Sequence, residues 1–255
     1  MIDTHAHVDT RPFEDFELMA IGGVTDVLTL AHDPMRMSSS AVFRDHFDRL
    51  LAEKLRAGKS GVRLHICLGL HPRSRPGDIG LCYELLESYL KSGQAVAVGE
   101  TGLETRDSLE ADMFHRQIEL AMKYNLPIIA HTPRSSKVQI TKEIINILST
   151  FSIDSDRVVI DHADAETVRL ILVRGYNAGL TVQPGKVTPS VAAEIVKKYD
   201  SNRLVINTDM SSNASDVLGV PRAAHVMRMT GVERATIDAV CDLNARRIFR
   251  IAQIG

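Results

Sequence analysis

Eight short apolar runs, each the length of one buried strand, recur along the chain and alternate with amphipathic helical patterns. Most of the runs are continuously apolar, which is typical of parallel strands covered on both faces. The predicted strands occupy residues 2–5, 24–31, 62–70, 95–99, 127–131, 158–162, 178–182 and 204–208. The helical patterns occupy residues 39–57, 81–91, 109–124, 135–148, 163–174, 190–199, 214–229 and 232–251. This alternation predicts an α/β fold, a single (β/α)8 TIM barrel spanning residues 1–255.

The alternative architecture is a doubly wound open sheet, which usually carries a glycine-rich phosphate loop after its first strand. The segment THAHVDT at residues 4–10 stands there instead. No linker or composition shift divides the chain, and its length suits one barrel of roughly 250 residues. We therefore favour the barrel.

Composition excludes several classes of protein. An apolar fraction of 44% and a charged fraction of 24% are typical of a globular domain and exclude disorder. A net charge of −2 gives no overall attraction for nucleic acid, and 5% aromatic residues without Trp leave few platforms for stacking bases. Three scattered cysteines, Cys67, Cys82 and Cys241, fit a reducing cytosol. Neither a signal peptide nor a long apolar run is found, so we expect a cytoplasmic protein that does not associate with a membrane. We also expect no obligate protein partner.

The carboxyl ends of the strands surround the active site of a TIM barrel. Five of the ten histidines and two carboxylates fall at the predicted ends. These residues are His5, His7, His71, Glu100, His131, His162 and Asp209. Imidazoles and carboxylates gathered at one end of a barrel predict a metal site.

His5 and His7 are two residues apart on an extended segment, so they share one face and lie roughly 7 Å apart along the strand. Both rings can therefore reach one ion between them. Glu100 follows the apolar run AVAVG. A carboxylate there is costly unless it is paired or bound to metal, and its two oxygens could bridge two ions.

Each residue also has a structural interpretation. His131 and His162 could be hydrogen-bonded core histidines, and Glu100 could pair with a barrel lysine or arginine. Asp209 could cap the following helix, or ligate one ion and accept a proton from its water. Asp3 and Asp161 adjoin candidate ligands and are interpreted as supporting or structural groups.

Four imidazoles and two carboxylates exceed what one tetrahedral ion needs, so we expect two divalent ions. An imidazole-rich set favours zinc, with Mn, Fe, Co, Ni or Mg as alternatives. A water between two such ions would be acidified to hydroxide near neutral pH, and hydrolysis would follow.

The chain resembles the TatD family of metal-dependent hydrolases, within the amidohydrolase-like barrels. The matching stretches are IDTHAHVD (2–9), GLHPR (69–73), AVGETGLE (97–104), FHRQIELAMKYNLPIIAHTPR (114–134), VIDHAD (159–164), NTDMS (207–211) and NARRIFRI (244–251). They cover nearly the whole chain in the order and spacing of the family.

The resemblance implies one ion between His5, His7, Glu100 and Asp209, and a second between Glu100, His131 and His162. It also implies substrate contacts from His71 and Arg134, whose alternative is that both are solvated loop residues.

Departures from the family pattern are expected to lie around the substrate and not around the metals. Asn207 stands where an acidic residue is usual, Met210 where a proline or small residue is usual, and Glu104 where aspartate is commoner. Residues 183–190 also differ from the usual loop after the seventh strand.

The resemblance favours a phosphodiesterase that trims DNA ends, with Asp209 as proton acceptor and Glu100 as the metal bridge. Arg134 and His71, and also Arg73 or Lys186, could neutralise the phosphate. One alternative keeps the metals and changes the substrate to a small-molecule amide, lactone or phosphate ester. The other is a non-catalytic barrel that binds a partner.

Overall fold

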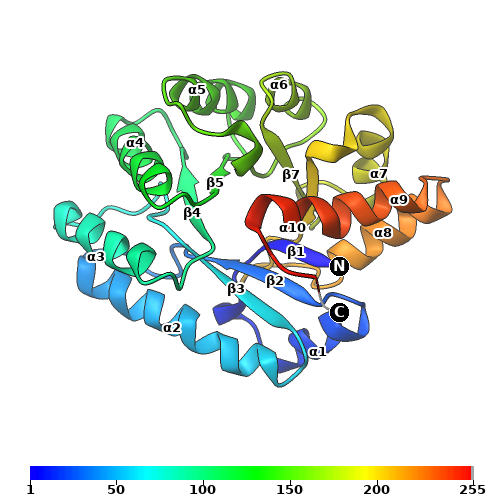
Figure 1. Cartoon of the computed structure of the whole chain (residues 1–255), viewed down its shortest axis with the longest axis horizontal. Helices are drawn as coiled ribbons and strands as arrows, with labels where there is room; N and C mark the ends of the chain where they lie inside the picture. Colours follow the sequence, from blue (N-terminus) through cyan, green and yellow to red (C-terminus); the bar gives the residue numbers. More distant parts are fainter. Residues whose placement is uncertain (254–255) are drawn as a thin grey trace.

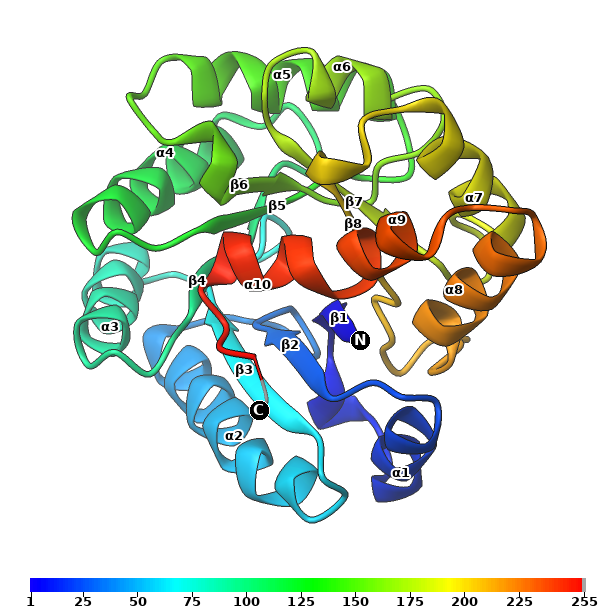
Figure 2. The same cartoon turned by 45° about the vertical axis from the view of Figure 1, so that its right-hand side comes forward.

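A computed structural model describes residues 1–253 and contains eight parallel strands in sequential order (Figures 1 and 2). The strands are β1 Ile2–Ala6, β2 Asp26–Leu30, β3 Arg63–Leu68, β4 Ala97–Gly102, β5 Ile128–His131, β6 Val158–Ile160, β7 Asn177–Thr181 and β8 Leu204–Asn207. Each predicted strand overlaps its observed counterpart. The predicted α/β barrel class is therefore confirmed.

The first and last strands meet and complete the ring. An isolated parallel bridge joins Ala6 to Met210, and the backbone N–H of Asp209 donates to the carbonyl of His5 at 2.8 Å. The N–H of His7 likewise donates to the carbonyl of Met210 at 2.8 Å. These contacts fix the end of β1 against the segment that follows β8.

Helices surround the strands (Figure 1). They are α1 Phe13–Ile21, α2 Ser40–Gly58, α3 Ile79–Lys91, α4 Ser108–Lys123, α5 Lys137–Ser149, α6 Val168–Leu172, α7 Pro189–Lys198, α8 Gly219–Met229, α9 Arg234–Asp238 and α10 Asn244–Phe249. Among the helices described in residues 1–253, none is both long enough and apolar enough to cross a bilayer.

One helix was missed and two helix predictions were wrong in extent. Sequence periodicity missed α1 because apolar residues lie on both its faces, with Phe16 buried and Ile21 83% exposed. The predicted helix 163–174 shrinks to the five residues of α6, since a turn occupies its first part. The predicted helix 232–251 is divided by a π-helical segment, Ala239–Leu243.

The apolar core has two parts. A larger cluster packs the strands against the surrounding helices, and a smaller one lies among Leu28, Ile129 and Val205 together with Ile248 and Phe249 of α10. Helix α10 crosses one end of the ring of strands in both views (Figures 1 and 2). One end of the barrel is thus filled by apolar side chains, and the carboxyl ends of the strands lie at the other.

Candidate metal centre

The site begins with two histidines at the carboxyl end of β1. His5 Nδ1 donates to Asp161 Oδ2 at 2.6 Å, and His7 Nδ1 donates to the carbonyl of Leu30 at 3.1 Å. Both Nδ1 atoms therefore carry a proton, which leaves the Nε2 atoms as the positions at which the rings could bind a metal ion. The two Nε2 atoms face each other at 3.3 Å.

Two carboxylate oxygens complete this arrangement. Glu100 Oε2 lies 3.4 Å from His5 Nε2 and 3.6 Å from His7 Nε2. Asp209 Oδ1 lies 3.6 Å from His5 Nε2 and 3.1 Å from His7 Nε2. Ligand atoms at the corners of a zinc tetrahedron are about 3.3–3.5 Å apart, given metal–ligand bonds of roughly 2.0–2.1 Å. The four side chains, called here the central cluster, therefore fit a metal ion.

The other oxygen of Glu100 faces a second pair of histidines. Glu100 Oε1 lies 2.7 Å from His131 Nδ1 and 3.2 Å from His162 Nε2. The remaining ring nitrogens are also bound, His131 Nε2 to Glu104 Oε2 at 2.8 Å and His162 Nδ1 to Thr181 Oγ1 at 2.8 Å. Glu100 thus has one oxygen beside each pair of histidines, as a bridging carboxylate would.

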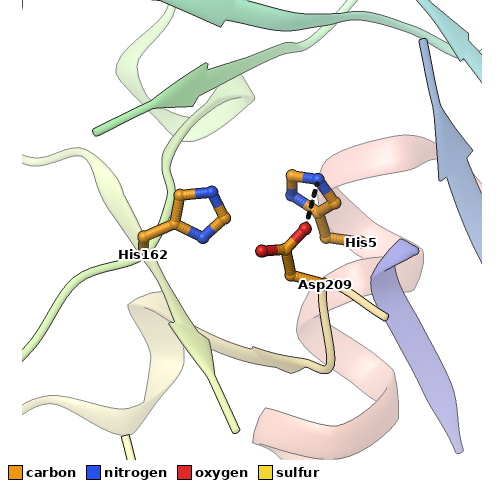
Figure 3. Close-up of side chains that lie close together, drawn as sticks. All are labelled: His5, His162 and Asp209. Carbon is orange, nitrogen blue, oxygen red and sulfur yellow. Dashed lines mark ion pairs between the residues drawn. The ribbon is translucent and has the colours of Figure 1, made fainter. Parts of the chain in front are cut away.

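Two of these side chains are carried by an unusual backbone. His162 has a φ of +59° and Asp209 a φ of +46°, in the left-handed region that favours glycine. Such positions are costly and persist where the surroundings fix them, often at functional sites. With this backbone conformation, the side chains of His162 and Asp209 lie close to that of His5, and all three converge in Figure 3.

The electrostatics of the site favour a cation. Burial opposes the charge of Glu100, but His5, His71 and His131 outweigh it and hold the pKa of Glu100 well below its usual value. Burial likewise opposes the charge of Asp209, yet contacts led by His7 keep its pKa well below normal. Both carboxylates are therefore ionised over the working pH range. Ionised carboxylates are the form that binds a cation.

The imidazoles respond to the same field. Burial lowers the pKa of His5, but Glu100 and Asp161 raise it well above its usual value. The pKa of His131 is also raised, because Glu100 and Glu104 outweigh burial. Burial and the charge of Lys186 lower the pKa of His162 to about 4. A metal ion would compete with protons at His5 and His131 but not at His162.

A cavity of about 730 Å³ opens over the central cluster. No phenylalanine or tyrosine is among the described residues that line it. His71 is buried in its wall, so the expectation of a solvated loop residue is wrong for this histidine. Its Nε2 lies 3.7 Å from Glu100 Oε2, and burial lowers its pKa to about 3. Arg134 is exposed in the same cavity.

Two structural alternatives for the carboxylates are wrong. The ion pairs of Glu100 within residues 1–253 are with histidines, not with a lysine or arginine. Asp209 does not cap a helix, because α8 begins at Gly219, after Leu218 as its N-cap.

The departures from the family pattern contact the candidate ligands or their hydrogen-bond partners, which corrects the expectation that they lie only around the substrate. Asn207 Nδ2 donates to Asp161 Oδ1 at 2.8 Å, and Asp161 in turn holds His5. Glu104 holds His131, as described above. From the loop after β7, Lys186 Nζ and Gln183 Nε2 donate to Asp209 Oδ2 at 2.5 Å and 3.0 Å. Sequence reasoning missed Gln183, although the Pro-Gly turn beside it was a visible signal.

The two aspartates interpreted as supporting groups differ. Asp161 contacts a candidate ligand directly, whereas Asp3 accepts hydrogen bonds from the backbone N–H and Oγ1 of Thr208 at 3.1 Å and 2.6 Å. Burial raises the pKa of Asp3 to about 6, despite these bonds. Asp3 therefore ties β1 to the end of β8.

A second buried group of similar residues, Asp9, His32 and His46, is called here the outer cluster. The rings of His7 and His32 are tilted by 32° with centroids 4.2 Å apart, so the two clusters adjoin. His32 Nε2 donates to Asp9 Oδ1 at 3.1 Å, and His46 Nε2 accepts the backbone N–H of His32 at 3.2 Å. Arg49 Nε lies 3.9 Å from Asp9 Oδ2. Sequence reasoning missed this cluster.

Comparison with known proteins identifies the family. Residues 2–250 match the family described as TatD related DNase. An uncharacterized metal-dependent hydrolase of Methanocaldococcus jannaschii is 39% identical over 253 residues, 98% of this chain and 100% of the relative.

Solved structures agree. The crystal structure of a TatD-like protein from Archaeoglobus fulgidus superposes with a TM-score of 0.84 at 31% identity, covering 98% of this chain and 100% of that one. An amidohydrolase from Mycoplasma synoviae shares the fold, with a TM-score of 0.74 at 14% identity over 98% and 87% of the two chains. The chain therefore belongs to the TatD-related DNase family of metal-dependent hydrolases.

Proposed function

We propose that the protein is a phosphodiesterase with a pair of divalent metal ions, zinc being the expected metal. His5, His7, Glu100 and Asp209 would hold one ion, and Glu100 would share the second with His131 and His162. The observation that carries this proposal is the convergence of two histidine Nε2 atoms and two carboxylate oxygens, with each Nε2 atom 3.1–3.6 Å from the other Nε2 and from both oxygens.

When bound, such ions lower the pKa of a water molecule and polarise the phosphoryl group. In the proposed hydrolysis, the water oxygen bonds to phosphorus and the bond from phosphorus to the ester oxygen breaks. Asp209 accepts the proton that the water loses, and the departing ester oxygen takes it up. Lys186 and Gln183 hold the carboxylate of Asp209 in place, and His71 and Arg134 face the substrate from the cavity wall.

The family name favours DNA as the substrate, and the experiment starts there. Purified protein loaded with zinc, manganese or magnesium is offered single-stranded DNA, duplex DNA, RNA and bis(p-nitrophenyl) phosphate. We expect cleavage that a chelator abolishes and that Glu100→Gln removes. Failure to cleave any of these substrates with any metal would contradict the phosphodiesterase.

A small phosphate ester, amide or lactone is the second candidate substrate. The cavity favours it, because no phenylalanine or tyrosine among its described lining residues offers a stacking surface, and Arg73 is already paired with Asp33. The dependence of activity on salt concentration distinguishes the two candidate substrates. Cleavage of a polyanion falls steeply as salt is added, whereas hydrolysis of a small molecule changes little.

We also propose that the protein works in the cytoplasm. Its three cysteines are free and buried, which suits a reducing compartment.

A further inference from the structure

The segment after β7 is a tight turn with the sequence Gln-Pro-Gly-Lys at residues 183–186. The backbone N–H of Lys186 donates to the carbonyl of Gln183 at 3.1 Å, and the glycine between them has a φ of +78°. Proline second and glycine third with positive φ define a type II turn. A parallel bridge between Val182 and Val187 closes its base. The turn therefore holds Gln183 and Lys186 side by side.

The ammonium group of Lys186 lies at the edge of the candidate centre. Its side chain is 12% exposed and lines the cavity. Nζ contacts Asp209 Oδ2 at 2.5 Å and lies 3.1 Å from His162 Nδ1. An ammonium has three N–H donors, so at least one remains for a ligand in the cavity.

A second cation lies against the same turn. Arg134 Nη1 is 4.0 Å from the position that a Cβ atom would take on Gly185, so the guanidinium lies beside the turn. Of the three cationic side chains that line the cavity, Arg73 and Lys186 form ion pairs within residues 1–253 and Arg134 does not. Arg73 is held by two contacts to Asp33 at 2.7 Å and 2.8 Å.

The surroundings confirm that positive charge gathers on this side of the cavity. Lys137 donates to the carbonyl of His162 at 2.7 Å, on the backbone beside the His162 ring that Lys186 contacts. The side chain of Ser135 lines the cavity beside Arg134 and adds a neutral donor.

We propose that Lys186 and Arg134 form an anion subsite that binds a phosphate group of the substrate, with the turn at 183–186 as its scaffold. Paired cations with neutral donors suit an oxyanion with several oxygens, because charge-assisted hydrogen bonds are the strong ones. The placement of this subsite beside the reacting group rests on the proposed function, whereas its affinity for phosphate does not. The turn makes Lys186 a residue that determines specificity.

The test is the binding of inorganic phosphate to the zinc-loaded full chain, measured by titration calorimetry. Lys186→Met should raise the Kd at least about tenfold, the loss of one hydrogen bond to a charged group, and Arg134→Gln should raise it in the same direction. Lys186→Arg should restore most of the affinity. Lys142→Met, an exposed lysine on α5, is the matched control and should bind phosphate like the wild type. Acetate should bind more weakly than phosphate.

Metal content is measured for each variant, because Lys186 also contacts Asp209. If Lys186→Met loses metal, the test of the subsite rests on Arg134→Gln. No hydrogen bond or ion pair joins the Arg134 side chain to a candidate ligand within residues 1–253. Unchanged phosphate affinity in a metal-replete Arg134→Gln and Lys186→Met, or equal affinity for acetate, would overturn the subsite. If phosphate binding depends on both residues but no phosphoester is hydrolysed, the subsite stands and the proposed function fails.

Discussion

The central and outer clusters are both built from imidazoles and carboxylates. They adjoin at the rings of His7 and His32, which belong to the central and the outer cluster respectively. In the central cluster, the Nδ1 atoms of His5 and His7 donate to Asp161 and to the carbonyl of Leu30, so their Nε2 atoms face one another. In the outer cluster, His46 Nε2 already accepts a backbone N–H and His32 Nε2 donates to Asp9.

The two clusters also differ in the ionisation of their side chains. Burial lowers the pKa of His46 to about 3 and also lowers that of His32. The pKa of Asp9 is lowered too, because His32 and His46 outweigh its burial, and Arg49 lies beside it. The ring nitrogens of the outer cluster are thus bound within the cluster, whereas the two Nε2 atoms of the central cluster face each other and two carboxylates. We expect this difference in proton placement, and not residue type, to decide which cluster binds metal.

The largest effect is expected from removing the shared carboxylate. Glu100→Gln should abolish binding at both proposed ion positions and lower kcat by more than the roughly 100-fold that loss of an outer partner costs. Elemental analysis and steady-state kinetics measure this. Glu104→Gln is the matched control, with a smaller loss, because Glu104 contacts only His131 of the six candidate ligands. Full metal content in Glu100→Gln would contradict the bridge.

A smaller effect should follow from loosening His5. Asp161→Asn removes the acceptor of the His5 Nδ1 proton and should weaken metal affinity roughly 10–100-fold. Competition with a chromophoric chelator measures the affinity. An unchanged affinity would mean that Asp161 does not orient a ligand.

The matched change in the outer cluster should leave the metals in place. Asp9→Asn replaces a carboxylate that also accepts from a histidine, and should cost about 1–3 kcal/mol of unfolding free energy without loss of metal. Chemical denaturation and elemental analysis report the two quantities. Loss of one ion from this variant would erase the distinction between the clusters.

The smallest effect concerns pH. The pKa values of His46, His71 and His162 are lowered to about 3, 3 and 4, so their contribution to stability is lost as pH falls below about 6.5. The pKa values of His5 and His131 are raised, so their contribution is present below about 6.5 and is lost as pH rises through the folded values. Protein stripped with a chelator should therefore be most stable near pH 6.5.

Calorimetry of stripped and zinc-loaded protein measures this dependence. The stripped protein should lose at least about 2–4 °C in Tm on the alkaline side, the shift that 1 kcal/mol gives in a domain of this size. Bound zinc should remove that loss. A Tm of the stripped protein that keeps rising above pH 6.5 would count against the protonated His5 and His131.

The sequence predicted the parts of the molecule that periodicity and topology determine. Apolar runs, most of them continuous, marked all eight strands, and because parallel strands end at one edge, the six candidate ligands lie together. Their role as ligands stays a prediction. Periodicity could not show the positive φ of His162 and Asp209, since no residue-type signal marks it.

Other features depend on long-range contacts. The outer cluster joins the segments that follow β1 and β2 to helix α2 through Asp9, His32 and His46, and nothing in their separate neighbourhoods indicates that they meet. The hydrogen bond from Asn207 to Asp161 joins β8 to the residue after β6 in the same way. Sequence spacing carries no information on such pairs.

Anomalous diffraction from zinc-soaked crystals, recorded on both sides of the zinc edge, would locate the proposed ions. Two peaks should appear, one among His5, His7, Glu100 and Asp209, and one among Glu100, His131 and His162. A peak among Asp9, His32 and His46 instead, or no peak near Glu100, would contradict the account.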